Sequence, residues 1–151
     1  MPTFYHESLK VVMRYRVSAE FPLPAPPAAA VIAWLDAQPV DTLYISAITR
    51  AEIELGLALL PEGRRRQQII AAVQTMFAPF AERCLVFDEA AAVHYGQIVA
   101  GRLRQGRPIT VEDAQIAAIA LARGLRLATR NTTDFAAIPM LAVLNPWQLT
   151  P

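Results

Sequence analysis

The stretch TVEDAQIAAIALARGLRLAT, residues 110–129, predicts a helix that leads directly into a strand. The helix opens with two acids and then becomes almost wholly apolar, with Gln115 as the only polar side chain between Asp113 and Ala122. Thr110 is typical of a helix N-cap, and Asp113 three residues later completes a shortened capping box. Gly124 is typical of a helix end. A helix this apolar predicts burial against the rest of the fold.

The same alternation of short apolar strands and helices runs along the whole chain. We expect strands at residues 9–17, 42–46, 84–87, 125–129 and 141–145. We expect helices at residues 29–38, 47–60, 64–80, 88–106 and 110–122. Strands that alternate with helices indicate a mostly parallel sheet covered on both faces, so the fold class is α/β.

The length and composition of the chain favour one domain with a large core. The 151 residues carry a net charge of +1, and 54% of them are hydrophobic. No apolar run reaches the roughly 20 residues that span a bilayer, so we expect a cytoplasmic protein without a membrane partner. The single cysteine, Cys84, excludes an internal disulfide framework and a cysteine-rich zinc site. Its segment RCLVF predicts a buried, inert thiol.

Candidate chemistry rests on carboxylates, because the chain has no Gly-rich phosphate loop, no paired metal-type histidines and no serine nucleophile elbow. Glu52 and Glu54 lie two apart on a helix and point in different directions. Asp113 opens the buried helix, and Asp134 follows the strand at 125–129, where open α/β sheets bind ligands. Carboxylates gathered there need a hard cation such as Mg²⁺ or Mn²⁺. The alternatives are that Asp113 is only a cap and that Glu52 is a solvated helix acid.

Three blocks of the chain together resemble the PIN-domain ribonucleases, specifically the VapC and FitB-like toxins of bacterial toxin–antitoxin pairs. They are YISAITRAEIELGLALLPEGRRRQ (44–67), ITVEDAQIAAIALARGLRLATRNTTDF (109–135) and VLNPW (143–147). The resemblance runs from about Ala28 to Trp147. It implies a three-layer α/β/α sandwich with a mostly parallel central sheet, occupying residues 1–151 as one domain. It also implies a Mg²⁺- or Mn²⁺-dependent endoribonuclease with an RNA substrate, a cognate antitoxin protein and a homodimeric state.

The resemblance also implies the metal-binding and catalytic residues. Glu52 fills the acid position in AEIELG, which selects it over Glu54, and Asp113 fills the acid position in EDAQIAAIA. The last acidic position of the family falls in TRNTTDF, where Asn131 aligns best and Asp134 is the nearby acid. An asparagine can ligate a metal through its carbonyl oxygen, although it brings no negative charge.

The first strand departs from the family pattern, which ends that strand with an aspartate that binds metal. Counting back from Trp34 places this position near Tyr15, and there is no acid between Glu7 and Glu20. Arg14 and Arg16 flank the position and would repel a cation. One explanation is that residues 1–25 are translated out of frame; the other is a genuine divergent N-terminus with Glu20 moved into the site. Either way we expect weak or absent nuclease activity, and the alternative function is a non-catalytic degenerate toxin that binds antitoxin or dimerises.

Arginines gather in three clusters: Arg64, Arg65 and Arg66; Arg102, Arg104 and Arg107; and Arg123, Arg126 and Arg130. Such clusters are either solvated helix ends or a surface that binds the phosphates of a nucleic acid, since arginine makes bidentate contacts to phosphate. The sequence leaves both interpretations open.

Overall fold

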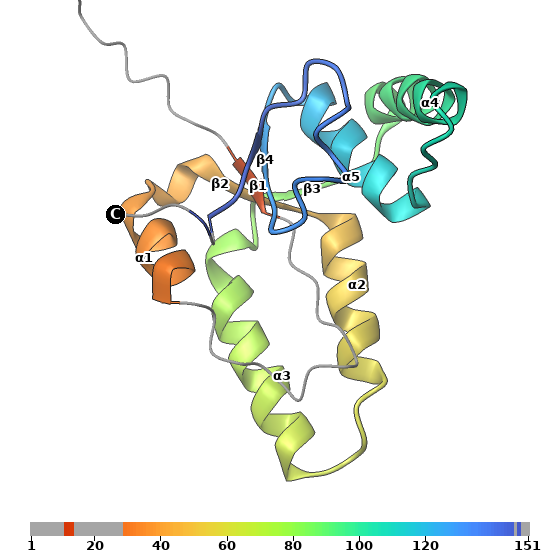
Figure 1. The fold of residues 1–151 in the computed structure, drawn as a ribbon. Coiled ribbons are helices and arrows are strands. Elements are labelled where there is room, and N and C mark those ends of the chain that lie inside the picture. Colours follow the sequence, from red (N-terminus) through yellow and green to blue (C-terminus); the bar gives the residue numbers. More distant parts are fainter. Residues whose placement is uncertain (1–10, 14–28, 147, 149–151) are drawn as a thin grey trace, which may run out of the picture.

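A computed structural model describes residues 11–13, 29–146 and 148 of the chain. The strands are β1 (Val11–Met13), β2 (Leu43–Ser46), β3 (Cys84–Leu85), β4 (Arg126–Ala128) and β5 (Val143–Leu144). The helices are α1 (Ala29–Ala37), α2 (Ala47–Ala58), α3 (Arg64–Phe77), α4 (Glu89–Arg104) and α5 (Val111–Ala122), with short 3-10 turns at Val40–Thr42 and Ala78–Phe80. Figure 1 shows the strands at the centre, with α1 on one side and α4 and α5 on the other.

The described strands form one parallel sheet in the order β3-β2-β1-β4-β5. β1 lies in the middle, where Met13 pairs with Ile45 of β2 and with Ala128 of β4. Parallel neighbours require crossover connections. Helices lie between β1 and β2, between β2 and β3, and between β3 and β4, while a loop without a helix joins β4 to β5. The carboxyl ends of β1, β2 and β4 therefore meet at one edge of the sheet.

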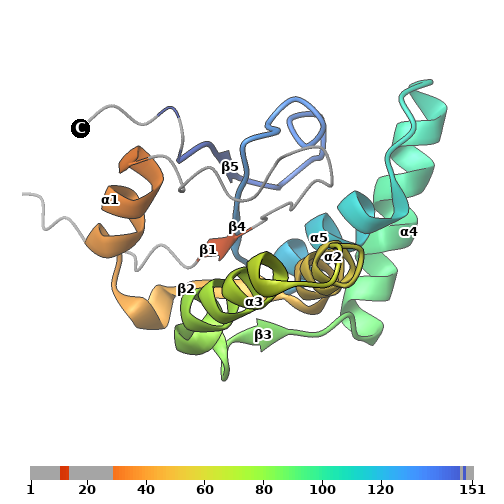
Figure 2. The same cartoon turned by 90° about the horizontal axis from the view of Figure 1, so that it is seen from below.

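The two faces of the sheet pack against different helices, because side chains alternate along each strand. Leu43 and Ile45 of β2 pack with residues of α1, α2 and α3. Tyr44, between them, packs with the core formed by α4 and α5. Figure 2 shows the same separation, with α1 and α4 at opposite ends of the molecule and the strands between them. The three-layer α/β/α architecture expected from the sequence is confirmed.

Helix α5 is the most buried helix that the structure describes. Ile116, Ala117, Ile119 and Ala120 have no exposed surface and pack in one cluster with Ala91 and Ile98 of α4. Small side chains on α5 allow the neighbouring helix to approach closely, and close packing maximises dispersion contacts. The burial predicted from the apolar run at residues 114–122 is confirmed.

The observed elements are shorter than the sequence predicts at several ends. The strands expected at 84–87, 125–129 and 141–145 are trimmed to two or three residues. For the strand expected at 9–17, residues 9–10 and 14–17 lie outside the described residues. The prediction of a buried Cys84 is wrong: the residue is exposed, because β3 is a two-residue strand at the edge of the sheet. Across the described helices, none has the length and apolar character required to cross a membrane.

Candidate functional site

Two buried hydroxyl side chains mark the carboxyl-end edge of the sheet. Ser46 ends β2, and Thr129 directly follows β4; both are almost fully buried. The pairing of Met13 with Ile45 and Ala128 places both residues one step past the end of β1. The Ser46 Oγ accepts a hydrogen bond from the backbone N–H of Thr49 at 3.0 Å and so caps α2. The edge is therefore polar but shielded from solvent, which is the setting in which an electrostatic interaction is strongest.

Glu52 lies in the second turn of α2, beyond the Ser46 cap, and its Oε2 atom is buried. Glu54 points elsewhere, is exposed, and forms an ion pair with Arg50 at 2.5 Å. The two side chains therefore diverge, as their spacing on a helix requires. The choice of Glu52 over Glu54 as a candidate ligand stays a prediction.

Asp113 occupies the first turn of α5 and is only 4% exposed, with a buried Oδ1 atom. Its backbone N–H donates to the Oγ1 atom of Thr110 at 3.2 Å, so Thr110 is the N-cap that the sequence predicts. Glu112 is exposed, as expected for an acid at the outer side of a helix start. Helices α2 and α5 contact one another, which brings the elements that carry Glu52 and Asp113 together.

The loop after β4 carries the other two candidate residues, and they bind each other. The Nδ2 atom of Asn131 donates to the Oδ2 atom of Asp134, and the backbone N–H of Asn131 donates to the Oγ1 atom of Thr129 at 3.1 Å. Asn131 is exposed and Asp134 is half-buried. The Thr129 hydroxyl thus links this loop directly to the end of β4.

The candidate side chains offer the type of donor atom that a divalent cation prefers, but too few of them lie together. Every candidate side chain offers oxygen, which is what Mg²⁺, Mn²⁺ and Ca²⁺ prefer. Within the described parts of the chain, however, no three His, Cys, Asp or Glu side chains come together as a metal-binding group. The assignment of Glu52, Asp113, Asn131 and Asp134 as ligands stays a prediction.

Arg102 fits neither of the two interpretations of its arginine cluster, a solvated helix end or a phosphate-binding surface. It is 5% exposed, so it is neither a solvated helix end nor available to a phosphate. Its guanidinium donates to the backbone oxygens of Arg107 and Asp134, at 2.7 and 2.9 Å. Sequence analysis also missed the buried hydroxyls of Ser46 and Thr129. The available signal was position: each directly precedes a helix or a loop that carries a candidate acid.

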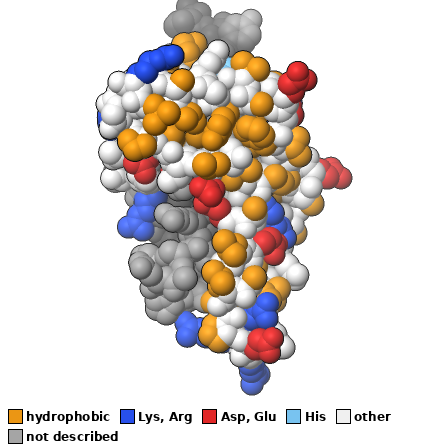
Figure 3. Space-filling view, turned by 90° about the vertical axis from the view of Figure 1, so that its right-hand side faces the viewer, with side chains coloured by type: hydrophobic (Ala, Val, Ile, Leu, Met, Phe, Trp, Pro, Cys, Tyr) orange, Lys and Arg blue, Asp and Glu red, His pale blue; other side chains and the backbone are white. Residues whose placement is uncertain are grey.

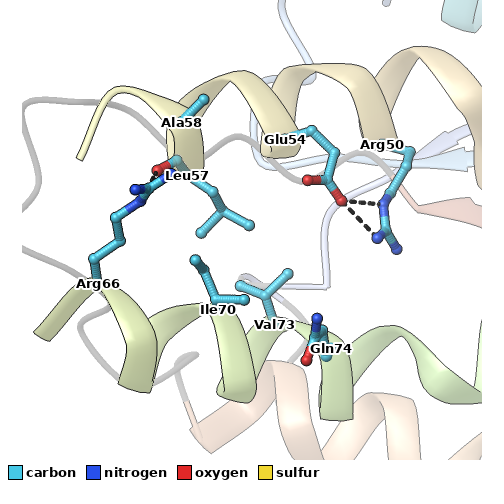
Figure 4. Close-up of a pocket in the computed structure, with 8 residues that line it drawn as sticks. All are labelled: Arg50, Glu54, Leu57, Ala58, Arg66, Ile70, Val73 and Gln74. Atoms are coloured by element: carbon cyan, nitrogen blue, oxygen red, sulfur yellow. Dashed lines mark hydrogen bonds and ion pairs between the residues drawn. The ribbon is translucent and has the colours of Figure 1, made fainter. Parts of the chain in front are cut away.

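A separate cavity of about 130 Å³ lies between α2 and α3, away from the candidate residues. Figure 4 shows Leu57, Ile70 and Val73 at its apolar centre, with the ion pair of Arg50 and Glu54 at one side and Arg66 at the other. Arg66 donates from Nε to the backbone oxygen of Leu57 at 3.3 Å. None of Glu52, Asp113, Asn131 and Asp134 lines this cavity, so it is distinct from the candidate site.

Comparison with known proteins identifies the family. The family model described as "PIN domain" matches residues 19–140, a span that begins six residues after the last residue of β1. The chain is 42% identical over 125 residues to "VapC ribonuclease Y4jK" of Sinorhizobium fredii, covering 82% of this chain and 89% of that protein.

Solved structures agree with the sequence comparison. The crystal structure of FitAcB from Neisseria gonorrhoeae superposes with a TM-score of 0.79 at 38% identity, covering 92% of this chain and 99% of that one. A member of the VapBC family of toxin–antitoxin systems, VapBC-5 from Mycobacterium tuberculosis, gives a TM-score of 0.65 at 25% identity, covering 90% and 97%. The family match, the relative and the shared fold agree over most of the chain, and the protein therefore belongs to the PIN-domain family.

Proposed function

We propose that this chain is a VapC-type toxin: a divalent-metal-dependent endoribonuclease that a cognate antitoxin neutralises in the cytoplasm. One observation carries the proposal. Two carboxylates with buried oxygens, Glu52 in the second turn of α2 and Asp113 in the first turn of α5, lie on helices that contact each other, and α2 begins directly after the carboxyl end of β2. Relatives named VapC ribonuclease and structures of a toxin–antitoxin system support the assignment.

Mg²⁺ or Mn²⁺ is the cation that these residues would hold, with Glu52 and Asp113 as carboxylate ligands and the Asn131–Asp134 pair contributing from the loop after β4. A bound divalent cation supplies an activated water and stabilises charge on a phosphoryl oxygen. The protein contributes a fixed position for the candidate ligands Asp113 and Asn131. Thr110 holds the backbone of Asp113, and Thr129 holds that of Asn131, at 3.2 and 3.1 Å.

Exposed arginines near the same elements would hold the RNA backbone. Arg107 precedes α5, Arg126 is the first residue of β4, and Arg130 follows that strand; all three are exposed. Contacts to phosphate give affinity and a strong dependence on salt concentration, but no choice of sequence. Arg102 does not belong to this set, because it is buried.

The first strand lowers the expected activity. The sequence has no acid between Glu7 and Glu20, so the carboxylate that the family places near residue 15 is missing. Fewer negative ligands weaken the binding of a hard cation. We propose that residues 1–25 are out of the native frame. Resequencing the locus tests this: another frame should encode an Asp-Thr motif ahead of AAVIAWLD, and its absence leaves the divergent N-terminus as the explanation.

Cleavage of a labelled RNA tests the function, with Mg²⁺ or Mn²⁺ added and with EDTA as the metal-free control. We expect the Tyr15→Asp variant to cleave RNA at least about tenfold faster than the unmodified chain. Mutating a residue that only orients a metal ligand commonly lowers metal affinity or activity about tenfold or more, and a direct ligand should matter at least as much. Asp113→Asn, added to Tyr15→Asp, should abolish the gain. If Tyr15→Asp stays inactive while both variants remain folded, the proposed ligand set is wrong. A parallel assay on single-stranded DNA separates a ribonuclease from a deoxyribonuclease of the same fold.

The second candidate function is a non-catalytic toxin that still binds antitoxin or dimerises. The observation in its favour is that, among described residues, no three acids, histidines or cysteines gather as a metal site. A titration with Mn²⁺ separates the two functions, because a ligand that binds the folded state raises the melting temperature. A saturable rise favours the nuclease, and an unchanged melting temperature favours the binding protein.

A homodimer fits an apolar face of the molecule. Figure 3 shows the side that lies to the right in Figure 1, where α4 is found, and hydrophobic side chains gather on it. On α4 the side chains of Val93 and Leu103 are 60% and 63% exposed. Exposed apolar patches commonly mark interfaces between proteins. We propose this helix as the contact between two copies of the chain.

A further inference from the structure

Arg102 is the buried cation that the proposed function leaves unexplained. It lies in the last turn of α4, and among the described residues it forms no ion pair with a carboxylate. Burying a guanidinium costs free energy unless its N–H donors have acceptors. The acceptors of Arg102 therefore indicate its structural role. Its two acceptors in the structure are backbone oxygens in loops, at Arg107 and Asp134, rather than atoms of α4 itself.

The first acceptor belongs to the turn that leads into α5. Helix α4 ends in a Schellman motif, in which Gly106 has φ +65° and the N–H groups of Gly106 and Arg107 bond to the oxygens of Leu103 and Arg102. The Arg102 Nε then donates to the Arg107 oxygen at 2.7 Å. Arg102 and Arg107 are thus joined twice, once through the backbone and once through the side chain. This fixes the start of a short loop that ends at Thr110, the cap of the helix carrying Asp113.

The second acceptor belongs to the loop after β4. The Arg102 Nη1 donates to the Asp134 oxygen at 2.9 Å. The neighbouring Phe135 is fully buried in the core shared with α4 and α5, and its N–H bonds to the Thr132 oxygen at 3.2 Å. The carboxylate of Asp134 remains directed to Asn131. The guanidinium therefore holds the backbone of this loop, while the side chains of Asn131 and Asp134 bond to each other.

We propose that Arg102 is a positioning residue, whose buried guanidinium ties the loop that sets Asp113 to the loop that carries Asn131 and Asp134. The proposal rests on the proposed function, because Asp113, Asn131 and Asp134 act together only if they bind the same metal ion. Two donors on one rigid plane suit two fixed carbonyls, whereas the single ammonium of lysine does not. Mutating a residue that orients a metal ligand without touching the metal commonly lowers metal affinity about 10- to 100-fold.

Amide hydrogen exchange on the full-length, metal-free chain tests the tie directly. Arg102→Met keeps the aliphatic stem and removes both donors. We expect the amides of Asp113 and Ala114, and those of Asn131 and Phe135, to exchange about tenfold faster or more, because charged hydrogen bonds to both loops are lost. Arg102→Lys should restore protection in one of the two loops at most.

The controls are Ile98→Val and Ile98→Ala, which truncate a buried side chain one turn earlier in α4 and bracket the loss of stability. They should accelerate exchange across the whole α4–α5 core. If Arg102→Met gives the same uniform pattern, or affects only one of the two loops, the proposed tie is wrong.

Mn²⁺ binding, followed by the electron paramagnetic resonance signal of the free ion, is the second readout. Arg102→Met should weaken binding about 10- to 100-fold, while the Ile98 variants and the exposed-site variant Arg104→Met should bind as the unmodified chain does. Unchanged affinity in Arg102→Met would mean that Arg102 supports only the loops and not the site. If the unmodified chain shows no saturable binding, the ligand assignment fails, and hydrogen exchange still decides the tie between the loops.

Discussion

The hydroxyl of Thr110 accepts a hydrogen bond from the backbone N–H of Asp113 at 3.2 Å, which holds Asp113 in the first turn of α5, where the residue is 4% exposed. The cap satisfies one of the donors that a helix start leaves unpaired. Asp113 itself lies where the helix dipole favours negative charge. Thr110 therefore supplies the cap of α5, and Asp113 is not the capping residue.

Removing this cap should cost measurable stability. Thr110→Ala should lower the free energy of unfolding by about 1 kcal/mol, because the N–H of Asp113 loses its acceptor. Thr110→Ser keeps the hydroxyl and should stay within a few tenths of a kcal/mol of the unmodified chain. Urea denaturation measures both. Equal stability of the alanine and serine variants would mean that the hydrogen bond contributes nothing.

Asp113 should carry the response to metal. Mn²⁺ should raise the melting temperature of the unmodified chain, and Asp113→Asn should remove most of that rise, because the amide brings no negative charge. Glu112→Gln is the matched control, since Glu112 is the adjacent exposed acid. Differential scanning fluorimetry over a range of Mn²⁺ concentrations gives the comparison. A rise that survives in Asp113→Asn would remove this residue from the ligand set.

Asp88 should contribute more to stability than the arginine that pairs with it. Its Oδ1 accepts from the Ala91 N–H at 3.0 Å and caps α4, while its Oδ2 pairs with Arg123 at 2.6 Å. Both side chains are more than a third exposed, so Arg123→Met should cost only about 0.5 kcal/mol. Asp88→Ala also loses the cap and should cost about 1–2 kcal/mol. Urea denaturation of both variants measures the two costs, and the cost of Arg123→Met should shrink at high salt, because salt screens an exposed ion pair.

Charge on the exposed face of α4 should disrupt the proposed dimer. Val93→Glu combined with Leu103→Glu should shift the chain to a monomer in sedimentation equilibrium, because each carboxylate would have to lose its water in the interface. The control is Val40→Glu, which adds charge at another exposed apolar residue, 58% exposed, near α1. A chain that is monomeric before any substitution contradicts the proposal directly.

Much of the fold could be predicted because local patterns and tertiary packing agree. The helix at 111–122 follows from its apolar run and its predicted cap Thr110, which is present in the structure. The helix at 47–58 follows from its apolar spacing, whereas its cap Ser46 was not predicted. Strand ends and edge exposure could not be predicted in the same way. Cys84 sits in an apolar run, yet it is exposed because β3 has a neighbour on one side only.

The sequence by itself determined the family pattern, the acids Glu52 and Asp113, and the lack of a carboxylate near residue 15, because each depends only on which side chain stands at a position. Tertiary structure decided which groups share an environment. Arg102 belongs to a basic cluster in the sequence, but in the structure it is buried and donates to the loop after β4. Asn131 and Asp134 are bonded to each other. Burial and hydrogen bonding depend on segments far apart in the chain, so composition and spacing cannot specify them.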